Sequence, residues 1–111
     1  MKVVAEQCGG VAVMRPEGPI TWANAEEFKT EMSEAIEKNL GRIILDVTSV
    51  SYMDSKGLGV FVELSQELAQ SGKTLKICHI NETMRQVIEL TGLRALFECF
   101  VDVNSAVRSF L

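Results

Sequence analysis

The dipeptide Asp54-Ser55 carries the side chains of this sequence that are best placed for chemistry on a hydroxyl group. It follows an apolar run rich in strand-forming residues and precedes Lys56 and two closely spaced glycines. A serine in such a position has two possible roles. It either attacks a substrate as a nucleophile, or it accepts a group that another enzyme transfers to it.

A catalytic role for Ser55 requires a general base, usually histidine, and a third group that orients the base. The single histidine of the chain, His79, follows an apolar run and can lie at the same sheet edge as Ser55. However, residues 53–57 read Met-Asp-Ser-Lys-Gly, which is not the G-x-S-x-G elbow of hydrolases. We therefore predict that the chain is not an enzyme.

The glycines that follow Ser55 give no pattern for a built-in nucleotide or metal site. Gly57 and Gly59 begin a G-x-G, but Val62 occupies the third glycine position, and no Walker A pattern occurs. Asp46 and Asp54 flank the intervening loop without a further metal ligand that clearly joins them. We expect neither a cofactor nor a bound metal.

Three cysteines, Cys8, Cys78 and Cys99, form an odd set without paired spacing. This number fits neither a disulfide framework nor a zinc site. Each cysteine lies in an apolar, strand-like stretch. We expect all three to be small buried hydrophobic residues.

The same residues are consistent with Ser55 as a target of modification. Asp54 or Ser55 can cap a following helix, because either side-chain oxygen accepts a hydrogen bond from a free amide. A phosphoryl group on Ser55 would add about −1.5 to −2 charges near the positive helix end, which favours them by roughly 0.3–1 kcal/mol. Gly57 and Gly59 would let a partner approach closely. Alternatively, Asp54-Ser55 is an ordinary helix cap, and the glycines are small packing residues.

The elements that position these residues begin with a hairpin and a helix. Two apolar runs flank Gly9-Gly10, which predicts a tight turn between two strands. Asn24 and Glu27 resemble a capping box, and Gly41 supplies a helix end. Between them, apolar residues recur at helical spacing at Ala25, Phe28, Met32, Ala35 and Ile36.

The remaining sequence alternates between strands and helices. Residues 42–47, 74–80 and 96–101 are apolar runs typical of strands. A helical stripe begins at Leu58, while Asn81 and Asp102 can each cap a further helix. The chain is therefore predicted to be α/β: an N-terminal hairpin, then alternating helices and strands, with a mostly parallel central sheet and helices packed against it. Function in such sheets tends to lie at the carboxyl ends of the strands, where Ser55 falls.

Length and composition fit one domain, residues 1–111. The sequence is 47% hydrophobic and 23% charged, which allows a core to form without metal or disulfides. A net charge of −4 argues against nucleic-acid binding. No apolar stretch is long enough to span a membrane or to serve as a signal peptide, so we expect a cytoplasmic protein without membrane insertion. A monomer is the expected state, since no heptad pattern occurs.

Residues 46–64, Asp-Val-Thr-Ser-Val-Ser-Tyr-Met-Asp-Ser-Lys-Gly-Leu-Gly-Val-Phe-Val-Glu-Leu, resemble the signature of the STAS domain, and within that family the bacterial anti-sigma factor antagonists. The matching features are Asp46 at a strand end, Val50 and Tyr52 in the loop, the pair Asp54-Ser55, and the helix start at residues 57–60. The resemblance extends over nearly the whole chain and implies a single STAS-type domain.

The resemblance also implies a mechanism. In such antagonists, the serine that matches Ser55 is phosphorylated by the anti-sigma factor, which is also a serine kinase and binds the ATP. The unmodified antagonist binds this kinase and releases a sigma factor, and a serine phosphatase resets the phosphorylated form. The residues that the resemblance places at the partner surface are Asp54, Ser55, Lys56, Gly57, Leu58 and Gly59.

Two positions depart from the family pattern. Lys56 stands where a small or hydroxylated residue is common, and its cation can offset a phosphate or change which kinase accepts the site. Thr21 stands where aspartate is common before the first helix, and threonine can still cap. The alternative function is a STAS adaptor subunit of a stress-signalling scaffold or transporter complex, in which Ser55 is only a helix cap.

Overall fold

The computed structural model describes residues 1–111 and begins with the hairpin that the glycine pair predicts. Strand β1 (Lys2–Cys8) pairs antiparallel with β2 (Val11–Glu17). Gly9, in the turn, has a φ of 63°, a left-handed conformation that glycine adopts without strain. The hairpin prediction is therefore confirmed.

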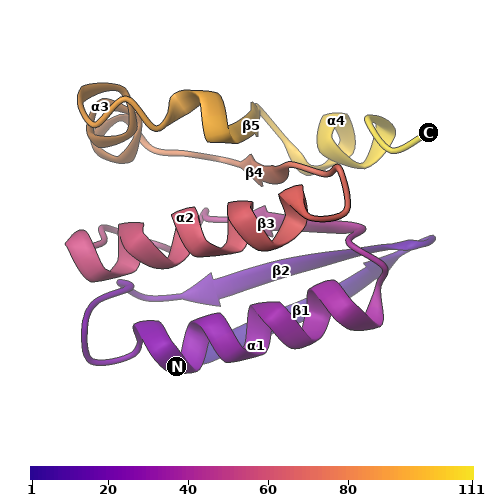
Figure 1. Cartoon of the computed structure of the whole chain (residues 1–111), viewed down its shortest axis with the longest axis horizontal. Coiled ribbons are helices and arrows are strands. Elements are labelled where there is room, and N and C mark those ends of the chain that lie inside the picture. The colour runs from indigo at the N-terminus through magenta and orange to yellow at the C-terminus, as the bar shows by residue number, and fades with distance from the viewer.

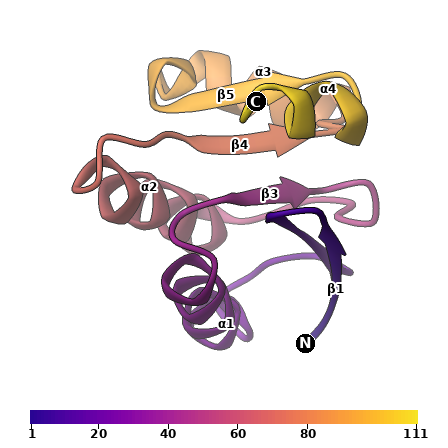
Figure 2. The ribbon, with the colours of Figure 1, turned by 90° about the vertical axis from the view of Figure 1, so that its right-hand side faces the viewer.

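Beyond the hairpin, helices and strands alternate (Figure 1). The sheet order is β1-β2-β3-β4-β5, and every pair after the hairpin is parallel, which confirms the predicted fold class. Figure 2 shows β3, β4 and β5 following one another in this order. The elements after the hairpin are α1 (Ala25–Lys38), β3 (Ile43–Asp46), α2 (Ser55–Ala69), β4 (Leu75–Cys78), α3 (Glu82–Leu90), the 3-10 helix η1 (Arg94–Leu96), β5 (Phe97–Phe100) and α4 (Val103–Arg108).

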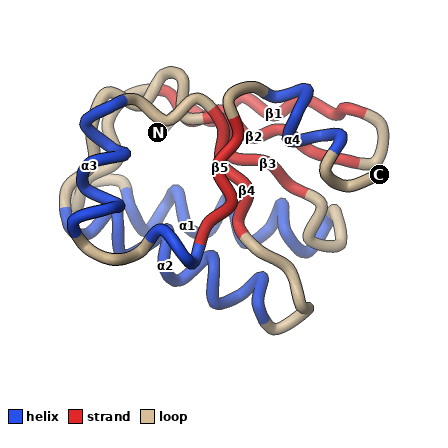
Figure 3. Tube along the Cα trace, turned by 90° about the horizontal axis from the view of Figure 1, so that it is seen from above, coloured by secondary structure: helices blue, strands red, loops and turns tan.

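The helices cover the sheet unequally. Each parallel strand is added on the same side of the previous one, so right-handed crossovers place α1, α2 and α3 on one face. Helix α4 follows the last strand and packs on the opposite face, and Figure 3 shows α3 and α4 on opposite sides of β5. None of the helices has the length and apolar character that crossing a membrane requires.

The main core lies between the sheet and α1–α3. It comprises 21 buried residues, and three phenylalanines form its centre. The Phe61 ring lies 6.2 Å from the rings of both Phe28 and Phe97, within the range of favourable aromatic contacts. A smaller cluster of five buried residues, including Ile44 and Ala106, fills the other face under α4. Strands β3 and β4 are buried along their whole length, as predicted for strands covered on both sides.

The capping box predicted at Asn24 and Glu27 is wrong. The Asn24 side chain makes no hydrogen bond to the first turn of α1. Its Oδ1 accepts from the Thr21 amide at 2.9 Å, and its Nδ2 donates to the Pro19 carbonyl at 2.9 Å. Asn24 thus closes the loop before the helix, because a side-chain amide can satisfy nearby backbone groups as readily as a helix end.

The prediction for the cysteines holds in part. Cys78 is buried in β4, as expected, whereas Cys8 is only partly buried. Cys99 is exposed, which corrects the prediction. The reason is topological: β5 is an edge strand, and the side of Cys99 that faces α3 is not fully covered. An apolar sequence run does not reveal that its strand will lie at the edge.

Candidate functional site

Two loops run side by side at the carboxyl edge of the parallel strands. The loop after β2 and the loop after β3 form a parallel bridge between Ile20 and Met53. The Ile20 amide donates to the Tyr52 carbonyl at 3.2 Å, and the Asp54 amide donates to the Ile20 carbonyl at 3.2 Å. This pairing fixes the position of the residues that immediately precede Ser55.

Asp54 is the N-cap of α2, which settles the choice between Asp54 and Ser55 left open by the sequence. Its Oδ1 accepts from the Gly57 amide at 2.9 Å, and its Oδ2 accepts from the Trp22 amide at 2.9 Å. The hydrogen bonds from Gly57 and Trp22 hold the pKa of Asp54 below its ordinary value. The carboxylate is therefore ionised at neutral pH and joins the two loops.

Ser55 is the first residue of α2 and is exposed to solvent. Its hydroxyl makes no hydrogen bond to another group of the protein, so it is available to bond to solvent or to a partner. The helix N-terminus beneath it supplies a partial positive charge. An external enzyme can reach this hydroxyl without displacing any internal contact.

Lys56, the position that departs from the family pattern, pairs with the first turn of α1. Its Nζ lies 2.9 Å from Glu26 Oε1, and both side chains are substantially exposed. The hydrogen bond to Glu26 raises the pKa of Lys56, and the same bond lowers the pKa of Glu26. The ammonium group next to Ser55 is thus already paired with a carboxylate of α1, that of Glu26.

The helix start predicted to face a partner is divided between interior and surface. Gly57 is buried, and a Cβ there would overlap the carbonyl oxygen of Ile20. Gly59 has no atom near the position of an added Cβ, and Leu58 is half-buried against the main core. A partner can therefore contact the helix directly at Gly59. Gly57, in contrast, is needed for close packing between α2 and the loop after β2.

Two aromatic residues beside Ser55 complete the surface. Trp22 is 79% exposed and Tyr52 is 52% exposed, and they are the only tryptophan and tyrosine of the chain. Trp22 was not identified from the sequence as a surface residue of this site. Its position as a lone tryptophan between Pro19 and an amphipathic helix could have indicated that role. Large aromatic side chains are enriched at the centres of protein interfaces. This edge of the molecule therefore exposes residue types that are common in protein interfaces.

His79 does not join Ser55. Its Nδ1 lies 3.0 Å from Asp46 Oδ1, and Asp46 also accepts from Arg15 Nε at 2.8 Å and from the Thr48 hydroxyl at 2.6 Å. Burial by itself raises the pKa of Asp46, but the hydrogen bonds from Thr48, His79 and Arg15 outweigh it and lower the pKa to about 2. The geometry lacks the serine–histidine contact that nucleophilic catalysis requires.

The same carboxylate brings together a trio with the donor types of a metal site. Ligand atoms of Asp46, Cys78 and His79 all lie within 4.8 Å of one another. Burial raises the pKa of the Cys78 thiol to about 12, so a metal ion would have to displace the thiol proton before it could bind the sulfur. Asp46 is also already saturated with donors. The trio fits a hydrogen-bonded junction between β3, β4 and the following loop better than a metal centre.

The first turn of α3 is also tied to the Ser55 loop. Asn81 caps α3 by accepting from the Met84 amide at 2.8 Å, which confirms the predicted cap. Its Nδ2 donates to the carbonyls of Val50 and Ser51, each at 3.3 Å. The loop that presents Ser55 is therefore held from both sides, by the loop after β2 and by the start of α3.

Comparison with known proteins found a matching family and similar sequences. The family model described as the STAS domain matches residues 2–106. BtrV of Bordetella bronchiseptica, whose name places it with the anti-sigma factor antagonists, is 26% identical over 110 residues, covering 99% of this chain and 95% of BtrV.

Solved structures share the fold. The Bacillus anti-sigma factor antagonist SpoIIAA superimposes with a TM-score of 0.73 in its unphosphorylated form, at 20% identity over 98% of this chain and 96% of that chain. Its phosphorylated form gives a TM-score of 0.71, at 23% identity over 97% and 99% of the two chains. A segment of the murine anion transporter Slc26a9 gives 0.71 at 18% identity over 95% of this chain and 18% of the transporter.

Proposed function

This chain belongs to the STAS domain family, and we propose that it is an anti-sigma factor antagonist whose binding is switched by phosphorylation of Ser55. The observation that carries the proposal is the exposed Ser55 hydroxyl, free of internal hydrogen bonds and adjacent to the ionised Asp54. The antagonist names among its relatives support the general function. SpoIIAA has been solved in both a phosphorylated and an unphosphorylated form. These two structures describe SpoIIAA, and for this chain they serve only as a precedent for the proposed switch.

In the proposed cycle, the unmodified chain binds an anti-sigma factor that is also a serine kinase, and a sigma factor is released. The docking surface consists of Ser55, the half-buried Asp54 beside it, and the exposed side chains of Lys56, Trp22 and Tyr52. The chain contributes binding and a hydroxyl group, while ATP belongs to the kinase. We place this exchange in the cytoplasm and treat the chain as a monomer.

Phosphorylation would change this surface without unfolding it. The kinase transfers the terminal phosphoryl group of ATP to Ser55 Oγ, ADP is released, and the hydroxyl proton leaves. The product adds about −1.5 to −2 charges next to the negative Asp54. Asp54 already accepts the hydrogen bond from the Gly57 amide, so this amide is not free to bond to the phosphate. The new charge would then face outward and repel an acidic or closely packed partner surface. A serine phosphatase would restore the binding form.

Lys56 gives this switch a feature of its own. Its ammonium group is the nearest cation along the chain to Ser55, and it is held by Glu26 in an exposed pair of the kind that contributes little to stability. A phosphate on Ser55 competes with Glu26 for Lys56. The strength of the switch therefore depends on how completely Lys56 neutralises the phosphate.

The second candidate function is an adaptor subunit without a phospho-switch. The likeness to a segment of Slc26a9 supports it, since the same fold occurs there as part of a transporter. That likeness is at 18% identity and concerns the fold alone. In an adaptor, Asp54 would cap α2 and Ser55 would stay unmodified. Phosphorylation at Ser55 therefore separates the two functions.

The experiment is a binding series with variants of one loop. The Ser55→Ala protein is first used to capture its kinase from native cells. The purified kinase is then titrated, in the presence of ATP, with four proteins: wild type, Ser55→Ala, Ser55→Asp and Ser51→Ala. Ser51 is the matched control, because it is exposed and lies four residues upstream. We expect Ser55→Ala to stay bound, Ser55→Asp to bind more weakly, and Ser51→Ala to be phosphorylated and released like wild type. Loss of binding by a folded Ser55→Ala protein would contradict the proposal.

A further inference from the structure

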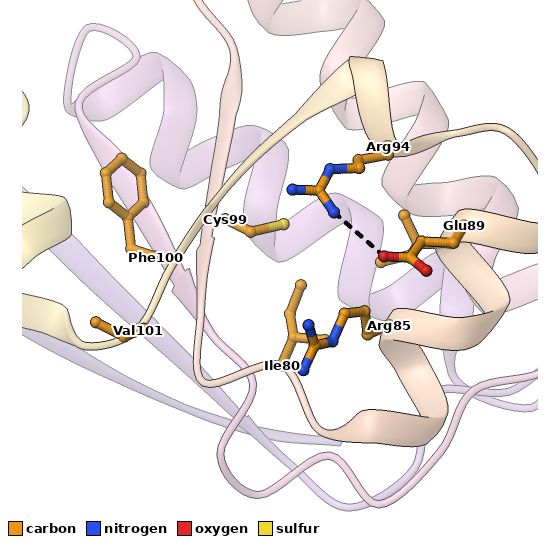
Figure 4. Close-up of a pocket in the computed structure, with 8 residues that line it drawn as sticks. Ile80, Arg85, Glu89, Arg94, Cys99, Phe100 and Val101 are labelled. Atoms are coloured by element: carbon orange, nitrogen blue, oxygen red, sulfur yellow. Dashed lines mark hydrogen bonds and ion pairs between the residues drawn. The ribbon is translucent and has the colours of Figure 1, made fainter.

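A cavity of about 330 Å³ lies between α3 and the edge strand β5 (Figure 4). Ile80 and Ile88 provide apolar walls from the α3 side, and Cys99 lies on the β5 side. The guanidinium groups of Arg85 and Arg94 lie on either side of the Cys99 thiol, whereas Phe100 points away from it. The volume is at the lower end of the ~300–1,000 Å³ range of small-molecule sites.

The cavity follows from the choice of side chains on β5. Phe97 fills its position by packing against Phe61, but Cys99, two residues later on the same face, is much smaller. Helix α3 buries only Met84 and Ile88, so it does not close over the strand. A hollow is left where a larger side chain on β5 would otherwise meet α3.

The cavity is lined by two arginines and one glutamate, Glu89, so its lining carries one net positive charge. Arg85 Nη2 contacts Glu82 at 2.9 Å, and Arg94 Nη1 contacts Glu89 at 3.2 Å, through one nitrogen in each case. Each guanidinium has five N–H donors, so most of them are free for a ligand. Both pairs are exposed and therefore weak, and an oxyanion that forms two parallel bonds with a guanidinium can displace a single glutamate contact.

The thiol does not compete with an anionic ligand. Burial raises the pKa of Cys99, and the opposing influence of Arg94 and Arg85 is smaller. Cys99 is therefore a neutral thiol at pH 7 and adds a soft, weakly polar surface to the cavity. The acidic partners of the two arginines, Glu82 and Glu89, both belong to α3, and neither comes from β5.

We propose that the cavity between α3 and β5 binds a small amphiphilic oxyanion. Its carboxylate or phosphate group lies between Arg85 and Arg94, and its apolar chain packs on Ile80, Ile88 and Cys99. The proposal is independent of the switch at Ser55. A ligand of about ten non-hydrogen atoms in such a site binds with a Kd of about 0.1–1 mM.

The test uses the purified full chain and three probes of eight carbons each: octanoate, octyl phosphate and the uncharged octanamide. Each probe is titrated into ¹⁵N-labelled protein, and the amide signals of Ile80, Cys99 and Val101 are followed. We expect saturable shifts with octanoate or octyl phosphate, and the stronger of the two identifies the head group. Octanamide should bind at least about tenfold more weakly, because it cannot form charge-assisted bonds.

Two variants and one control complete the test. Arg85→Gln/Arg94→Gln should weaken binding at least about tenfold. Cys99→Leu should abolish it by filling the cavity without any change of charge. Lys2→Gln/Arg108→Gln removes the same two charges from exposed positions elsewhere and should bind like wild type. The proposal would be overturned by equal binding of octanamide, by equal loss in the control, or by no shifts up to about 10 mM probe.

Discussion

The backbone amide of Trp22 donates to Oδ2 of Asp54 at 2.9 Å, across 32 residues of sequence. The residue that caps α2 thereby also fixes the loop that carries the most exposed aromatic side chain near Ser55. One carboxylate holds both the first turn of α2, which carries Ser55, and the loop that carries Trp22. Asp54 therefore couples the stability of α2 to the shape of the proposed docking surface.

Replacement of Asp54 by alanine should affect both properties. Loss of an N-cap bond is expected to lower Tm by about 5 °C. Loss of the bond to Trp22 should in addition weaken kinase binding, because the loop before α1 is released. Differential scanning calorimetry and titration with the kinase measure the two effects.

The matched control for this prediction is Asp102→Ala. Asp102 caps α4 by accepting from the Ser105 amide at 2.7 Å, and α4 packs on the opposite face of the sheet from α2. This variant should show a similar fall in Tm with unchanged kinase binding. Equal loss of binding in both variants would mean that general destabilisation, rather than the link to Trp22, causes the effect.

The two glycines of the helix start should respond in opposite ways. Gly57→Ala places a methyl group on the Ile20 carbonyl and should destabilise the protein by about 1–3 kcal/mol. Gly59→Ala has open space and should stabilise α2 by up to about 1 kcal/mol, because alanine is the better helix former. Urea denaturation of both variants measures this difference. A Gly57→Ala protein as stable as wild type would disprove the packing role.

The Gly59→Ala variant also tests the predicted partner surface. A methyl group at an open position changes the surface without weakening the fold. If the first turn of α2 faces the kinase closely, this variant should bind more weakly although it is more stable. Unchanged affinity would remove Gly59 from the contact surface.

Acid should weaken the fold through Asp46. Its folded-state pKa of about 2 lies below the ordinary value of 3.8, so the group stabilises the protein above about pH 4, and this stabilisation is lost as pH falls toward 2. The shift corresponds to about 2 kcal/mol for this nearly fully buried side chain. Asp46→Asn should lose about that amount at pH 7 and show a shallower fall in acid. A difference between the two proteins that does not vary with pH would refute the assignment.

The single tryptophan offers a direct reporter of docking. Because Trp22 is 79% exposed, contact with a kinase should bury it and shift its fluorescence to shorter wavelength. Trp22→Ala should weaken binding at least about tenfold, as expected for a hot-spot residue. Leu90→Ala is the control, since Leu90 is 87% exposed at the far end of α3. A Trp22→Ala protein with full affinity would exclude this residue from the interface.

Much of the fold follows from local patterns in the sequence. Gly9-Gly10 predicted the hairpin, and the β-branched run of residues 42–47 predicted a buried strand, because backbone sterics and burial act within a few residues. Asn81 and Asp102 were correctly identified as caps for the same reason. Asn24 was not, because its side chain is recruited by Thr21 and Pro19 of the preceding loop. A local rule does not show which of two adjacent backbone segments a side chain will satisfy.

The candidate site likewise combines features that follow from local sequence patterns with features that depend on contacts between distant segments. The helix cap next to Ser55 could be predicted from spacing, but the bond from Trp22 to Asp54 depends on two loops meeting across the sheet edge. The exposure of Cys99 and the cavity beside it likewise depend on β5 being the last strand. His79 lies near this edge, which the sequence left open, and its hydrogen bond goes to Asp46. Contacts between distant segments decide these features.

The most direct test of the switch is phosphosite mapping by mass spectrometry on the protein isolated from its native cells under several growth conditions. We predict phosphate on Ser55, with an occupancy that changes between conditions, and no phosphate on the neighbouring Ser51. A Ser55 that stays unmodified under every condition would contradict the switch and favour the adaptor function, with Asp54-Ser55 reduced to the start of a helix.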